Sequence, residues 1–127
     1  MEEKMKICIS KDFSETPGAR KRSDGGFSGE EFREDLLIPK FEEARRDQKK
    51  LVIDLDGGYG NPVSFTEEAF GGLAREFGTQ AVAEVLEFIS DDEKSLVNEI
   101  WDYINHPYDN TVYKHFIERE ETRKGKG

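Results

Sequence analysis

Residues 51–77, LVIDLDGGYGNPVSFTEEAFGGLAREF, decide the fold because they hold a strand, a turn and a helix in direct succession. Apolar residues at positions 51, 53 and 55 alternate with their neighbours, which is the period-two pattern of a strand over 50–56. An acidic turn rich in glycine follows at 57–62. The capping-box pattern of Ser64 and Glu67 then predicts a helix that ends near Phe77, where Gly78 suits a helix C-terminus.

The same patterns predict the elements on either side. Alternation predicts strands over 5–10 and 85–90, and a capping box, Ser28 with Glu31, predicts a helix over 29–47 that is kinked or broken at Pro39. The remaining expectations are a long loop or irregular hairpin over 14–26, a helical turn over 79–83, and a last helix that Asp91 or Asp92 caps and Pro107 follows. Strands that alternate with helices predict an α/β fold with a sheet that is at least partly parallel.

Length and charge limit the classes of protein. A chain of 127 residues predicts one domain, over 1–117 with apolar anchors at Tyr113, Phe116 and Ile117, followed by a charged and disordered tail over 118–127. The net charge of −9 argues against nucleic-acid binding, and the sequence shows no membrane segment and no signal peptide, so a cytoplasmic protein is expected. One cysteine and two scattered histidines form no zinc motif, and we expect no metal and no cofactor.

Two adjacent glycines inside the predicted helix need an explanation. A glycine in a helix costs about 1 kcal/mol relative to alanine. Gly71 and Gly72 lie away from the predicted core stripe, on a side that also carries Phe65, Glu68 and Arg75. One interpretation is an exposed face that a partner or ligand approaches closely, and the other is a neighbouring segment of the same chain that crosses there.

The strand end and turn give a second candidate site. Asp54 and Asp56 lie on one side of the strand, and with Arg20, Gly57, Gly58 and Tyr59 they could line a site for a small ligand or nucleotide. Glu67 and Glu68 in the first helical turn repel an anion, and no phosphate-binding motif is present. The two aspartates also suggest a metal-assisted phosphoryl hydrolase, but strand-end capping explains them more simply, and no catalytic residues are assigned.

At these residues the chain resembles a known family. MKICISKDFSETPGAR, GFSGEEFREDLLIP and the segment 51–78 are similar to the STAS-like family of bacterial and archaeal domains of unknown function, over roughly Lys4–Tyr103. The resemblance implies a STAS-like sandwich with a mixed, partly parallel sheet and helices packed mainly on one side. In anti-sigma-factor antagonists of this fold, the loop and helix after the central strand dock a histidine-kinase-like ATPase, and a serine there is phosphorylated.

The resemblance places Glu68 at the position of that phosphoserine and Glu67 at the preceding aspartate. A glutamate cannot be phosphorylated, so the phospho-switch is in doubt while docking is not. The leading hypothesis is therefore a non-enzymatic regulatory module that docks a protein partner on the loop and helix face Gly60–Arg75, through Phe65, Glu68, Gly71, Gly72 and Arg75. The alternatives are a ligand or nucleotide sensor, an enzyme, and a homodimer that forms through this face or the strand edge at 5–10.

Overall fold

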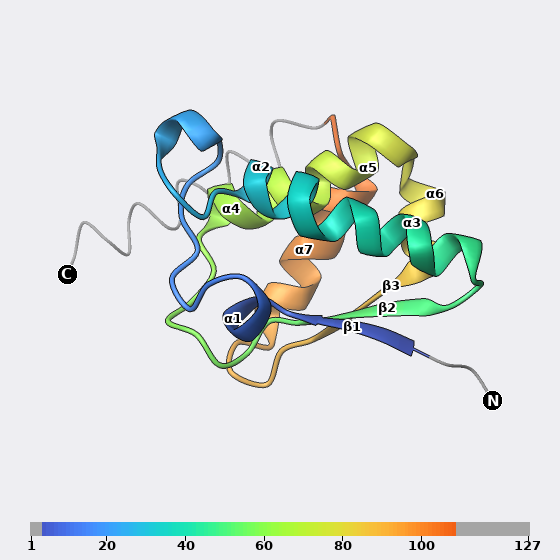
Figure 1. Cartoon of the computed structure of the whole chain (residues 1–127), viewed down its shortest axis with the longest axis horizontal. Helices are drawn as coiled ribbons and strands as arrows, with labels where there is room; N and C mark the ends of the chain where they lie inside the picture. The colour runs from blue at the N-terminus through green and yellow to red at the C-terminus, as the bar shows by residue number, and fades with distance from the viewer. Residues whose placement is uncertain (1–3, 109–127) are drawn as a thin grey trace.

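A three-stranded parallel sheet underlies the structure, a computed structural model that describes residues 4–108 (Figure 1). The strands are β1 (Lys4–Cys8), β2 (Lys50–Asp54) and β3 (Leu86–Ile89), in the order β1-β2-β3. The central strand β2 pairs in parallel with both neighbours, and Ile7, Ile53 and Phe88 stand side by side. The predicted α/β fold is confirmed, and the described strands are parallel throughout.

Apart from the short helical turn that directly follows β1, the helices lie together over one face of this sheet (Figure 1). Leu51 and Ile53 point toward the helices and are fully buried. On the opposite face, Lys6 Nζ lies 3.5 Å from Asp54 Oδ2, and Lys4 forms an ion pair with Glu87. The alternation of apolar and charged residues along each strand thus produces one packed face and one polar face.

Two long helical stretches, each of three consecutive parts, build most of the helical layer. The first is α2 (Gly29–Phe32), the π-helical turn η2 (Arg33–Leu37) and α3 (Ile38–Arg46). The second is α4 (Val63–Thr66), the π-helical turn η3 (Glu67–Gly71) and α5 (Gly72–Phe77). Shorter elements and the last helix complete it: α1 (Ile9–Asp12), the 3₁₀ turn η1 (Arg22–Asp24), α6 (Thr79–Val85) and α7 (Ser95–Asn105). The predicted C-terminal segment beyond residue 108, its anchors and the tail lie outside the described residues.

The first helical stretch runs through Pro39 without a break. A proline inside a helix lacks an N–H donor, and its ring clashes with the carbonyl four residues earlier. Here the turn before it, η2, is π-helical, and α3 continues with Pro39 in its first turn. The predicted break at Pro39 is wrong, because the chain passes directly from η2 into α3. The π-helical turn lies where the proline would otherwise clash with the preceding turn of a regular α-helix.

The chain leaves the sheet earlier than the alternation predicts. Asp12 Oδ2 accepts a hydrogen bond of 2.7 Å from the backbone N–H of Cys8, and residues 9–12 turn into α1. The strand predicted to reach Ser10 therefore ends at Cys8. The following residues form a loop rather than a hairpin, closed where the N–H of Gly18 donates to the carbonyl of Phe27 at 2.7 Å.

Only one of the two predicted capping boxes caps a helix. Ser28 Oγ accepts a bond of 3.0 Å from the N–H of Glu31, while the Glu31 carboxylate accepts from the N–H of Phe27 rather than of Ser28. The second stretch begins one residue before Ser64, after Pro62, and has no side-chain cap. The predicted roles of Ser64 and Glu67 as caps are wrong because Pro62 already sets the helical entry.

This difference predicts unequal effects of two serine substitutions. Ser28→Ala is expected to lower the free energy of unfolding by about 1 kcal/mol, since it removes an N-cap. Ser64→Ala, the matched control, is expected to change it by less than about 0.5 kcal/mol. Urea unfolding followed by circular dichroism measures both values. Equal losses in the two variants would contradict the assignment of Ser28 as the cap.

Candidate functional site

The helix face that was predicted to be exposed is buried. Phe65 is fully buried, with its ring centroid 5.5 Å from that of Phe32, and Glu68 is 4% exposed. Gly71 and Gly72 are buried as well. The prediction of an exposed Phe65 and glycine face is wrong, and the alternative, a crossing segment of the same chain, is what the structure has.

The crossing segment explains the glycine at position 72. The guanidinium group of Arg33, on η2, occupies the space where a Cβ atom of residue 72 would lie. A Cβ atom at position 71 would lie 2.6 Å from a carboxylate oxygen of Glu67 and 3.3 Å from Nη1 of Arg75. Gly72 therefore makes room for the Arg33 side chain, which crosses from the first helical stretch, and Gly71 makes room for Glu67 and Arg75 of its own stretch.

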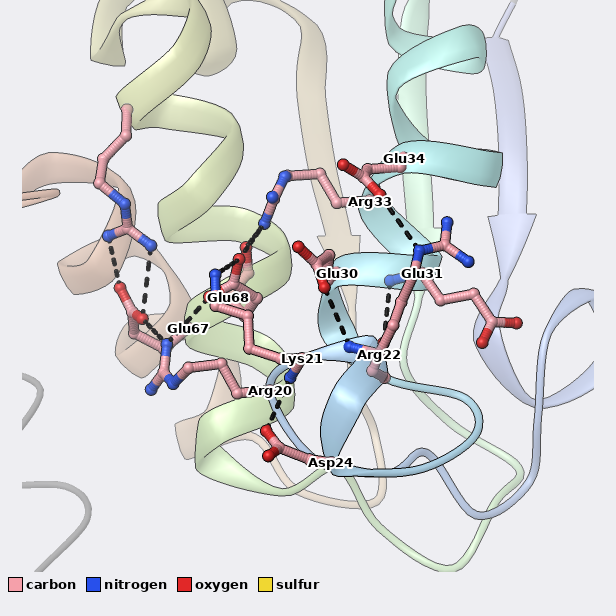
Figure 2. A network of polar contacts seen from close by, with 12 residues as sticks. Arg20, Lys21, Arg22, Asp24, Glu30, Glu31, Arg33, Glu34, Glu67 and Glu68 are labelled. Carbon is pink, nitrogen blue, oxygen red and sulfur yellow. Dashed lines mark hydrogen bonds and ion pairs between the residues drawn. The ribbon is translucent and has the colours of Figure 1, made fainter.

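These charged side chains form one compact group, which we call the Glu67–Glu68 cluster (Figure 2). Glu68 accepts from Arg33 Nη1 at 2.5 Å, and its other contacts are with Lys21 and Arg20, both at 3.3 Å. Glu67 pairs with Arg20 and, at 2.7 Å, with Arg75. Four cations thus surround two nearly buried carboxylates, and the cluster joins the loop 18–27 to both helical stretches.

The cluster holds Glu68 in its ionised form. Burial alone would raise the pKa of Glu68, but the hydrogen bond and charge of Arg33, together with Lys21, outweigh burial and hold that pKa below its ordinary value. An enclosed carboxylate that stays ionised suits a structural role better than proton transfer.

Acid is therefore expected to destabilise the fold partly through Glu68. Because its pKa is lower in the folded than in the unfolded state, the stabilisation is complete above the unfolded value of about 4.3 and is lost as the pH falls through the folded value. Urea unfolding at about pH 7 and about pH 3 measures the loss. Glu68→Gln should lose less stability over this interval, and an equal loss would contradict the assignment.

The residues predicted to bind a small ligand do not come together. Arg20 belongs to the Glu67–Glu68 cluster. Asp54, Asp56 and Gly57 line a hollow of about 440 Å³ next to the polar sheet face, which we call the sheet pocket. Tyr59 lines a different hollow, and Gly58 packs so closely on the carbonyl of Glu15 that a Cβ atom there would lie 2.8 Å from its oxygen. Asp54, Asp56 and Gly57 thus stay together, whereas Arg20, Gly58 and Tyr59 lie elsewhere.

The two aspartates fix the loops at the ends of the strands. Asp54 Oδ1 accepts the N–H of Asp56 at 3.0 Å. Asp56 accepts the N–H groups of Asp91 and Asp92 at 2.8–3.0 Å. Neither Asp91 nor Asp92 caps α7 as predicted, because that helix begins only at Ser95, after Lys94, and has no side-chain cap. Within residues 4–108, no three His, Cys, Asp or Glu side chains are grouped as a metal site.

A larger hollow, which we call the loop pocket, lies beside the loops that follow β1 and β2. It measures about 480 Å³ and is lined by residues from both loops and from the start of α7: Thr16, Pro17, Tyr59, Gly60, Asn61, Pro62, Val63, Glu93, Leu96 and Glu99. In parallel α/β sheets, ligands commonly bind beyond the carboxyl ends of the strands. From the sequence, Tyr59 had been associated with ligand binding and residues 60–63 with the docking segment Gly60–Arg75. The residues from the loop after β1 and from around α7 had not, because they meet the others only in the folded chain.

Residues 28–96, more than half of the chain, match the family described as a STAS-like domain of unknown function. This chain belongs to that family. No curated protein and no solved structure matches it. The matched part of the STAS-like domain begins at the cap Ser28 and contains both long helical stretches, β2 and β3.

The position of Glu68 in this STAS-like domain bears on the resemblance to anti-sigma-factor antagonists. Glu68, which the resemblance places at the position of their phosphoserine, is enclosed by Arg33, Lys21 and Arg20 instead of facing solvent. No helix within residues 4–108 has the length and apolar character needed to cross a lipid bilayer.

Proposed function

We propose that this STAS-like domain is a non-enzymatic regulatory module that docks a protein partner over the loop pocket. The observation that carries the proposal is the side chain of Tyr59, which is 85% exposed at the lining of this hollow. Exposed tyrosines are frequent among the residues that dominate binding energy in protein interfaces. The proposal keeps the loop end of the predicted docking segment Gly60–Arg75 and moves away from its helix face, which is packed inside the protein.

A rigid support favours docking at this place. The backbone N–H of Tyr59 donates to the carbonyl of Glu15 at 2.8 Å, which ties the loop after β2 to the loop after β1. The side-chain amide of Asn61 donates to the carbonyl of Leu55 at 3.1 Å. The loop is therefore held in place before binding, which lowers the entropy cost of association. A histidine-kinase-like ATPase remains the proposed partner by analogy of fold.

Co-purification from the native host tests the proposal. Tagged wild-type domain, Tyr59→Ala and Tyr108→Ala are compared, with the captured proteins quantified by mass spectrometry. Tyr108 is a matched control because it is 77% exposed and its hydroxyl contacts the carbonyl of Arg75 rather than the loop pocket. We expect Tyr59→Ala to lower capture of the specific partner at least about tenfold, which is the size of a hot-spot effect, and Tyr108→Ala to leave it unchanged.

The outcome that contradicts this docking site is equal capture by wild type and Tyr59→Ala. Light scattering after size-exclusion chromatography separates a second copy of the chain from a different partner. A dimer that Tyr59→Ala dissociates would place self-association, rather than a heterologous partner, at the loop pocket.

A further inference from the structure

The charges that line the loop pocket are all of one sign. Glu93 and Glu99 contribute two carboxylates, and its lining contains neither lysine nor arginine among the described residues. The sheet pocket differs, since Lys6 and Lys11 line it together with three aspartates. The whole chain carries a net charge of −9, so the long-range field adds to the local one. A cation is the complementary charge for the loop pocket.

The two carboxylates are presented in different ways. Glu93 is half-buried just before α7, and its contacts with the hydroxyl of Ser90 and the N–H of Leu96 use only its backbone carbonyl. Glu99 stands farther along α7 and is 9% exposed. The carboxylate of Glu93 is thus the more accessible of the two, and a guest that reaches deeper approaches Glu99.

The rest of the lining is largely apolar. Pro17, Pro62, Val63 and Leu96 supply aliphatic surface. Long cationic side chains bury their methylene stems against such surface while the charged head meets a polar partner. The ring of Tyr59 adds a face that attracts a cation. An aliphatic stem that ends in a positive charge, as in lysine or arginine, fits both parts of the lining.

We infer that the loop pocket accepts a lysine or arginine side chain from a basic segment of the partner protein. The inference rests on the proposed docking function and adds the chemical class of the partner. The loop pocket has a volume of about 480 Å³, within the range of about 300–1,000 Å³ that is common for ligand pockets. One long side chain and its neighbours can therefore enter it. Nucleic acids and acidic peptides meet repulsion from Glu93 and Glu99.

Direct binding of a basic peptide to the full chain tests the inference. The probe is fluorescein-labelled hexalysine, measured by fluorescence anisotropy at low salt, with hexaglutamate as the acidic counterpart. Glu93→Gln is compared with Glu42→Gln, which makes the same change in net charge at an exposed position of α3. We expect Glu93→Gln and Tyr59→Ala to weaken hexalysine binding about fivefold or more, and Glu42→Gln less than about twofold.

Several outcomes would overturn the inference. Equal losses of hexalysine affinity in Glu93→Gln and Glu42→Gln would mean that the overall acidic charge of the protein, and not the loop pocket, attracts the peptide. If hexalysine does not bind at all, a basic segment is not the guest of the loop pocket. Binding of hexaglutamate or of a single-stranded oligonucleotide would mean that the guest is negatively rather than positively charged. Spermidine that binds more tightly than hexalysine would make a free polyamine, instead of a protein segment, the occupant.

The experiment separates this inference from the proposed function. Partner capture that depends on Tyr59 but is insensitive to Glu93→Gln would retain docking at the loop pocket and overturn the basic guest. Partner capture that is insensitive to Tyr59→Ala would remove the docking site itself. Capture that both substitutions weaken, together with selective hexalysine binding, supports both conclusions.

Discussion

Arg33→Ala is expected to lower the free energy of unfolding by about 3 kcal/mol, because it leaves a buried carboxylate without its main partner. The Arg33 guanidinium donates to the Glu68 carboxylate at 2.5 Å and to the Glu68 backbone carbonyl at 2.6 Å. The side chains of Arg33 and Glu68 are only 13% and 5% exposed, so water cannot replace the lost contacts easily. Lys21 and Arg20 still neutralise part of the Glu68 charge, which keeps the expected loss at the lower end for a broken buried pair.

Two comparisons show whether the loss comes from the buried charge. Arg46→Ala removes an arginine whose ion pair with Asp47 is exposed, and it is expected to cost no more than about 0.5 kcal/mol. The double variant Arg33→Met with Glu68→Leu removes both charges and is expected to recover most of the loss, since apolar residues commonly replace buried ion pairs without cost. Urea unfolding of each variant gives the free energies.

The same variants also define the contradictory result. If Arg33→Ala lowers the free energy of unfolding no more than Arg46→Ala does, the buried Glu68 carboxylate does not need Arg33 as its partner. If the double variant is less stable than Arg33→Ala alone, the volume and shape of the two side chains matter more than their charges.

The starts and ends of several strands and helices could be predicted from the sequence. Alternation placed β2 within two residues of its observed end, and Ser28 marked the start of the first helical stretch correctly. Gly78 ends the second stretch with a φ of 95°, as a helix C-terminus commonly requires. Such signals are local, because each depends on residues a few positions apart. The alternation of strands and helices predicted a sheet that is at least partly parallel, and the described strands are all parallel.

The exposure of the helix over 63–77 could not be predicted in the same way. A helical projection of Phe65, Glu68 and Gly72 shows which residues share a side, but not what covers that side. In the structure, the first helical stretch and the loop 18–27 pack there, so a helix that looks two-faced is enclosed on both sides. The pairing of Glu68 with Arg33 spans 35 positions, which no local pattern reports.

The loop pocket was missed for a related reason. Its residues come from positions 16–17, 59–63 and 93–99, and each group looks like an ordinary loop or helix start when read alone. Glu93 and Glu99 belong to no sequence motif. They line a pocket only because α7 passes beside the loops after β1 and β2. The proposed partner chemistry therefore depends on the tertiary structure, whereas the choice of Tyr59 was available from the sequence.

Gly29→Ala tests the close packing that encloses the second helical stretch. Gly29 begins α2, and a Cβ atom there would lie 2.6 Å from the backbone carbonyl oxygen of Phe65 and 2.9 Å from Cβ of Glu68. Neither atom belongs to the end of a flexible side chain, so the helices themselves must move apart. We expect a loss of about 2–3 kcal/mol, in the upper part of the range of about 1–3 kcal/mol for overpacking a filled interior.

Gly26→Ala is the matched control for Gly29→Ala, only three positions earlier in the chain. No atom lies within 4 Å of a Cβ built at Gly26, and its φ is not positive, so alanine fits without strain. It should leave stability unchanged or raise it by up to about 1 kcal/mol, because alanine restricts the unfolded chain. Thermal and urea unfolding of both variants measures the contrast. If Gly29→Ala is as stable as Gly26→Ala, α2 and α4 are not in the tight contact that buries Phe65, and the helix face that carries Phe65 and Glu68 would again be open to a partner.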